Sequence, residues 1–149
     1  MSEENELNGS VSSKRMVCAA VLVMPIVYAV VLVAMSVGGI LPDAGFGGID
    51  GIDTQTLGYV FLAAGIGTSL TSILLKKIML QNLAGPVDVN RRFQTTLVAM
   101  AVAESGALFG FVFVLITGEV LYAALLGGLS FAVSCFHFPS RRWLMAGDE

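Results

Sequence analysis

Four long stretches of this chain carry almost no charge, and they decide what it can fold into. They are residues 16–42, 54–75, 93–118 and 120–140. The third stretch contains a single charged residue, Glu104. The fourth contains no Asp, Glu, Lys or Arg, only His137. Each stretch exceeds the roughly 18 apolar residues that indicate a transmembrane helix. None alternates polar and apolar residues as the strand of a membrane barrel does.

The composition agrees with a membrane protein whose partner is the lipid bilayer. Charged residues make up 13% of the chain, whereas a soluble domain carries about 25%. We predict an all-α fold, a four-helix transmembrane bundle that forms a single membrane domain over residues 14–143. Its predicted spans are residues 16–40, 56–76, 93–117 and 120–138. A mobile tail, 1–13, and a short tail, 144–149, should flank the domain.

The basic residues lie at the same ends of the predicted spans. They are Lys14, Arg15, Lys76, Lys77, Arg91, Arg92, Arg141 and Arg142. The segment 43–53, at the opposite ends, has aspartates and no base. By the positive-inside rule, both termini and the segment 76–92 should lie in the cytoplasm, as in a multi-pass protein of a bacterial inner membrane.

Several function classes find no support in the sequence. Cys18 and Cys135 lie inside apolar runs and are expected to be small apolar residues, not a disulfide or a metal site. His137 is predicted to be a residue of the membrane interface. The chain has no Walker, zinc or nucleophile-elbow motif. We therefore expect no enzyme activity, no cofactor beyond a bound H⁺ or Na⁺, no metal and no nucleic-acid partner.

Glu104 is the residue that most strongly suggests a function. It lies near the middle of its span, where a charged acid costs on the order of 3 kcal/mol. Leu97, Met100, Leu108 and Phe111 fall within about 40° of it on a helical wheel, and such apolar surroundings favour the neutral carboxyl. The pattern indicates a carboxyl that binds or carries an ion. The alternative is a structural hydrogen bond between helices.

Small residues predict where the helices pack closely. In the third span they form a stripe about 130° away from Glu104, namely Ala99, Ala103, Gly106 and Gly110. A stripe of this kind lets two backbones approach, within one chain or between copies in a homo-oligomer. In the second span Gly65 and Gly67 should play the same part. Thr68 and Ser69 follow them at a depth from which either hydroxyl could reach Glu104. The alternative is that they are ordinary packing residues, since small and hydroxyl residues are common in any membrane bundle.

Residues 101–110 read Ala-Val-Ala-Glu-Ser-Gly-Ala-Leu-Phe-Gly. They resemble the A-x-x-E-x-x-A-x-[YF]-G motif of subunit c, the proteolipid of rotary ATP synthases, and the hairpin 57–117 is similar to that family's hairpin. The resemblance implies that Glu104 is the ion-carrying carboxyl, that Ser105 is a hydroxyl ligand as in sodium-binding members, and that Phe109 takes the family's aromatic position.

Two kinds of function follow. In the first, an oligomeric, proteolipid-like membrane protein moves H⁺ or Na⁺ by means of Glu104, with Ser105, Thr68 and Ser69 as further ion ligands. In the second, the chain is a non-catalytic scaffold or accessory subunit of a larger membrane complex, and Glu104 serves as a polar tie.

Overall fold

The structure is a computed structural model, and it describes residues 2–42, 45–46, 53–81, 89–140 and 144. These residues form four helices and no strand. The helices are α1 (Ser2–Val37), α2 (Thr54–Gln81), α3 (Val89–Thr117) and α4 (Val120–His137). All four are long and apolar enough to cross a membrane. The predictions of an all-α fold and of a multi-pass membrane protein are confirmed.

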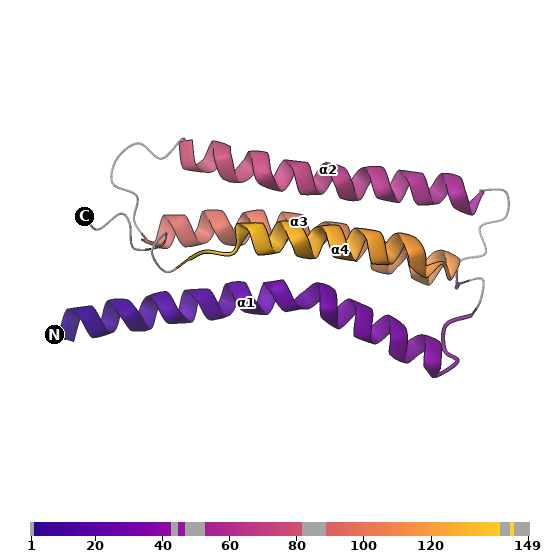
Figure 1. The fold of residues 1–149 in the computed structure, drawn as a ribbon, viewed down its shortest axis with the longest axis horizontal. Helices are drawn as coiled ribbons and strands as arrows, with labels where there is room; N and C mark the ends of the chain where they lie inside the picture. The colour runs from indigo at the N-terminus through magenta and orange to yellow at the C-terminus, as the bar shows by residue number, and fades with distance from the viewer. Residues whose placement is uncertain (1, 43–44, 47–52, 82–88, 141–143, 145–149) are drawn as a thin grey trace.

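The four helices lie alongside one another, with α3 and α4 between α2 and α1 (Figure 1). The start of α1, the end of α2, the start of α3 and the end of α4 lie towards one end of the bundle (Figure 1). We call this the basic end, because the ends of α1, α2 and α3 there carry Lys14, Lys76 and Arg91. The bases that the structure describes lie towards this end, while Arg141 and Arg142 fall outside the described residues; the assignment of this end to the cytoplasm remains a prediction.

The helix boundaries differ from the predicted spans chiefly at the basic end. α2 continues to Gln81 and α3 begins at Val89, so both helices extend past the predicted limits of 76 and 93. α1 begins at Ser2, within the segment predicted to be a tail. One reason is Val11, which is buried with Val89 and Leu144 and so connects this part of α1 to the rest of the protein.

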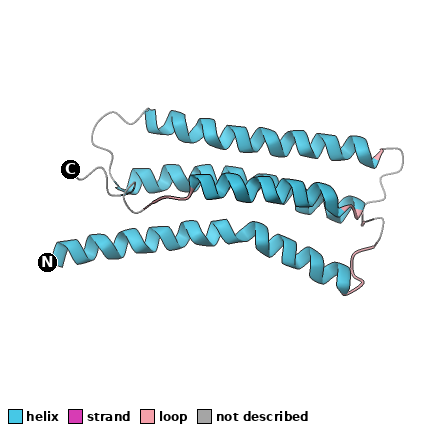
Figure 2. Cartoon of the chain, in the orientation of Figure 1, coloured by secondary structure: helices cyan, strands magenta, loops and turns pink. Residues whose placement is uncertain are grey.

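α1 is the one helix with an internal proline. Its ribbon is bent (Figure 1), and in the cartoon it remains helical throughout the bend (Figure 2). Pro25 lies inside it and supplies no backbone N–H, so one bond of the helical ladder is lost there.

α2, α3 and α4 pack closely through small residues. Ala99, Ala103, Gly106 and Gly110 are all buried on α3. A Cβ added to Gly110 would lie 2.9 Å from the Cα of Ala123 in α4, and one added to Gly65 would overlap Leu126. These glycines therefore permit contacts that no larger residue allows.

Gly67 differs from Gly65. No atom of another helix lies within 4 Å of a Cβ added there, so Gly67 makes no close contact with a neighbouring helix inside the protomer, and its packing role stays a prediction. It is two residues from Gly65, and positions two apart on a helix point to different sides.

Candidate functional site

The Glu104 carboxyl has a hydrogen-bond partner on α1. The hydroxyl of Tyr28 donates to Oε1 of Glu104 at 3.0 Å, and both side chains are partly buried. The ring of Tyr28 also lies against Phe111, with the centroids 5.5 Å apart. Phe111 is seven residues beyond Glu104 and therefore on the same face of α3. One tyrosine thus contacts the acid and one of the bulky residues predicted to frame it.

The depth of these two residues explains why they meet. α1 and α3 both run away from the basic end (Figure 1). The separation from Lys14 to Tyr28 nearly equals that from Arg91 to Glu104, about 20 Å of helix in each case. Tyr28 is also the one hydroxyl residue in residues 16–35. This coincidence of depth is the sequence signal that would have identified the partner.

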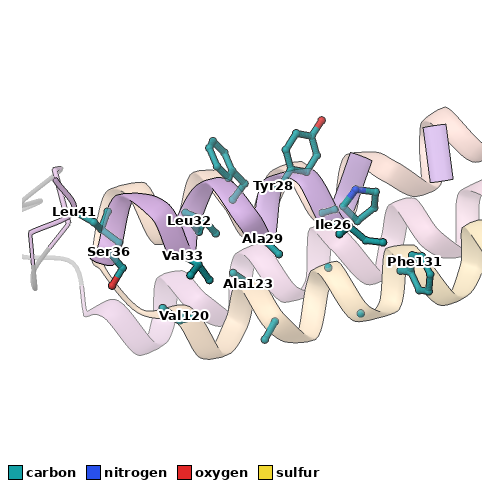
Figure 3. Close-up of a pocket in the computed structure, with 16 residues that line it drawn as sticks. Ile26, Tyr28, Ala29, Leu32, Val33, Ser36, Leu41, Val120, Ala123 and Phe131 are labelled. Carbon is teal, nitrogen blue, oxygen red and sulfur yellow. The ribbon is translucent and has the colours of Figure 1, made fainter. Parts of the chain in front are cut away.

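An apolar groove borders the site. It has a volume of about 390 Å³ and lies between α1 and α4, with Ala107 and Phe111 of α3 also lining it. Its α1 residues run from Pro25 to Ser36, and Leu41 lines it beyond the end of that helix. Ala123, Gly127 and Gly128 form part of the α4 side. Tyr28 lines the groove, but its hydroxyl points away from Ala123 and Phe131 of α4 (Figure 3). The hydroxyl is thus directed to α3 while the ring faces the groove.

The hydroxyls predicted on α2 do not bond to Glu104. Thr68 donates to the carbonyl of Gly65 at 2.9 Å, and its oxygen lies 3.6 Å from a Cβ added to Gly106. Gly106 is about 200° around α3 from Glu104. Ser69 is buried on α2 without a hydrogen bond to the acid. The hydrogen-bond partner of Glu104 in the structure therefore comes from α1, and of the two alternatives for Thr68 and Ser69 the contacts favour ordinary packing.

The two residues that the subunit c motif adds lie apart from the Tyr28 contact. Ser105 donates to the carbonyl of Ala101 at 3.3 Å, within its own helix. Phe109 faces α2, where its ring centroid lies 6.2 Å from that of Phe61. Neither side chain makes a hydrogen bond or ring contact with Glu104 in the described part of the chain.

The chemistry of the site is that of one carboxyl and one hydroxyl. Among the described residues, no three His, Cys, Asp or Glu side chains come together to hold a metal ion. Oxygen-ligated cations are held by several oxygens, which in membrane proteins include carbonyls of unwound helices. Glu104 lies inside a continuous helix, whose carbonyls are already paired. The geometry suits a proton better than a sodium ion.

A second group of buried polar residues was, apart from Ser69, not predicted from the sequence. It lies on α2, α3 and α4, and it comprises Ser69, Ser72, Thr95, Thr96, Ser130, Ser134 and His137. His137, predicted at the membrane interface, is 1% exposed. The available signal was the spacing of Ser130, Ser134 and His137, which places them on one face of α4.

Comparison with known proteins adds no relative: the chain matches no family model, no curated protein and no solved structure. The similarity of residues 101–110 to subunit c thus remains a prediction from the motif.

Proposed function

We propose that this multi-pass membrane protein binds and exchanges a proton at Glu104, with Tyr28 as the group that holds the carboxyl. The observation that carries the proposal is the 3.0 Å hydrogen bond between Tyr28 and Glu104. It lies near the middle of α3, where ionisation of an unpaired acid is costly. A neutral carboxyl that can release its proton when water or a partner arrives fits this position.

Tyr28 suits this role because a phenol can donate or accept a hydrogen bond. It donates to an ionised carboxylate and can accept from a protonated one. The same contact therefore holds Glu104 in both states. Glu104 is only partly buried, so its carboxyl is not sealed off from proton exchange.

The protein would exchange this proton within an assembly, as a homo-oligomer or with other membrane subunits. The small-residue stripe of α3 is occupied inside the protomer, since Ala99 and Ala103 have no exposed surface. Contacts between copies would therefore use other surfaces, such as the outer faces of α1 and α2, where Val30 and Tyr59 are exposed.

The second function is a non-catalytic scaffold, and one observation favours it. Tyr28 and Glu104 join α1 to α3, and interhelical hydrogen bonds in membranes contribute about 1 kcal/mol. In that case the carboxyl fixes α1 in place and exchanges no proton.

Dicyclohexylcarbodiimide separates the two functions, because it modifies protonated carboxyls in an apolar environment. We expect modification of Glu104 in the purified protein, detected by peptide mass spectrometry, to decrease as the pH rises and to be insensitive to sodium. Glu104→Gln should abolish it, whereas Glu119→Gln, at an exposed acid, should not. A Glu104 that resists modification at every pH would favour the scaffold. Protection by sodium would indicate a sodium site.

A further inference from the structure

Buried polar residues lie on α2, α3 and α4 in the basic half of the bundle, and one pair of them, Ser72 and His137, is in hydrogen-bond contact. We define the polar cluster as Ser69 and Ser72 of α2, Thr96 of α3, and Ser130, Ser134 and His137 of α4. Each of the six is at least nine-tenths buried. A Cβ added to Gly106 would lie 2.6 Å from the hydroxyl oxygen of Ser130. Since Gly106 is about 200° around α3 from Glu104, the cluster is distinct from the proposed proton site.

The hydrogen bonds of Ser72 determine which nitrogen of His137 carries a proton. The hydroxyl of Ser72 donates to the carbonyl of Ser69 at 2.7 Å. A serine has only one hydroxyl proton. The 3.1 Å contact between Ser72 and Nε2 of His137 therefore requires Nε2–H as the donor. In the neutral ring, Nδ1 is then an acceptor, and it is buried without a partner.

Four hydroxyls of the cluster are also without a partner. They belong to Ser69, Thr96, Ser130 and Ser134, and their oxygens are buried. Hydroxyls elsewhere in these helices bond to the preceding turn, as Thr68 does with Gly65 and Thr117 with Phe113. The four hydroxyls make no such bond. Together with Nδ1 of His137 they leave five polar atoms to satisfy between three helices, where lipid offers no hydrogen bond.

We propose that the polar cluster binds ordered water molecules between α2, α3 and α4. A water molecule donates and accepts, so it can bridge hydroxyls and donate to Nδ1 of His137. A metal cation fits less well, because the cluster contains no carboxylate and Lys76 donates to the carbonyl of His137 at 3.2 Å. That ammonium group places positive charge at the edge of the cluster.

The bound water should be confined to the basic half of the core. Away from the basic end, the next residue on the same face of α4 is Leu126, which is fully buried. Phe113 of α3 lies farther from the basic end than Leu126. Its ring centroid is 5.1 Å from that of Tyr122 and 5.5 Å from that of Phe61. These side chains form an apolar layer. The bound water thus reaches His137 inside the protein but does not pass this apolar layer to the other end of the bundle.

The chain's single histidine makes NMR a direct test. In full-length protein with ¹⁵N-labelled histidine, in a deuterated detergent, we expect the Nε2–H tautomer and cross-relaxation between water and the ring on its Nδ1 side. Ser72→Ala should shift the Nε2 signal, and Ser105→Ala should leave both signals unchanged. An Nδ1–H tautomer, or no contact with water, would overturn the proposal.

Thermal unfolding gives an independent test. If water satisfies Ser130 and Ser134, replacing both by alanine removes hydrogen bonds and should lower the Tm. In a dry core the same change removes two unpaired hydroxyls and raises the Tm. Ser105→Ala serves as the control, with no change expected. An unchanged or raised Tm for the double variant would contradict bound water, and the NMR result on the unaltered chain decides the question if the variant does not fold.

Discussion

The two sides of α3 are held in different ways. Towards α2 and α4, glycines and alanines bring the backbones together, and an added Cβ at Gly106 or Gly110 would lie within 3 Å of a neighbouring atom. Towards α1, the contact is a hydrogen bond and a ring contact made by Tyr28, beside an open apolar groove. We infer that the close packing of α3 against α2 and α4 makes a fixed core. The candidate proton site lies at the more loosely packed boundary between α3 and α1.

The largest effect should come from filling the close contact. Gly106→Leu would place its Cβ 2.6 Å from the hydroxyl oxygen of Ser130, which is too close for two unbonded atoms. We expect a loss of about 3 kcal/mol or more, or failure to fold. Size-exclusion chromatography and thermal unfolding in detergent would measure it.

Gly67→Leu is the matched control for this change. It places the same side chain on α2, where no atom of another helix lies within 4 Å of the added Cβ. The free energy of unfolding of this variant should therefore stay within about 0.5 kcal/mol of that of the unaltered protein. Equal damage from both substitutions would show that the core is not fixed by close packing at Gly106.

The boundary with α1 should respond more weakly. Glu104→Leu and Tyr28→Phe each remove the interhelical hydrogen bond, and we expect each to cost about 1–2 kcal/mol. Glu104→Gln retains an acceptor for Tyr28 and should unfold nearly as the unaltered protein does. In a double-mutant cycle of Tyr28→Phe and Glu104→Leu, the losses should not add, because both remove one bond. Full additivity would mean that the two residues are not coupled.

The smallest effect concerns Ser105. Its hydroxyl bonds within α3 and is not directed at Tyr28, so Ser105→Ala should change stability by less than about 0.5 kcal/mol. Modification of Glu104 by dicyclohexylcarbodiimide should also be unchanged. A strong decrease in that modification would restore Ser105 as an ion ligand, as the subunit c motif implies.

Hydropathy was sufficient to predict the four helices, but not which helices lie side by side in the bundle. The spans could be predicted because backbone groups in lipid must bond within a helix. A helical wheel could also separate Glu104 from the stripe of Ala103 and Gly106. It could not show that α1, and not α2, lies on the side of Glu104, because lateral order depends on side-chain fit between all four helices. The sequence therefore left Thr68 and Ser69 as candidates, whereas the observed partner is Tyr28.

The polar cluster and the start of α1 were missed for related reasons. A hydroxyl residue in an apolar run has the same hydropathy whether it faces lipid or another helix, so the hydropathy of Ser130 and Ser134 does not show that they are buried. The first residues of α1 are polar and predict a tail, yet Val11 is buried there.

Infrared spectroscopy of the carboxyl tests the central claim most directly. A protonated carboxyl has a C=O stretching band that a carboxylate lacks, and the band shifts with its hydrogen bonds. At neutral pH in lipid, we predict a band that disappears in Glu104→Gln, shifts in Tyr28→Phe and stays unchanged in Glu119→Gln. If the unaltered protein and Glu104→Gln gave the same spectrum in the carboxylic-acid region, Glu104 would carry no proton, and the proposed function would be wrong.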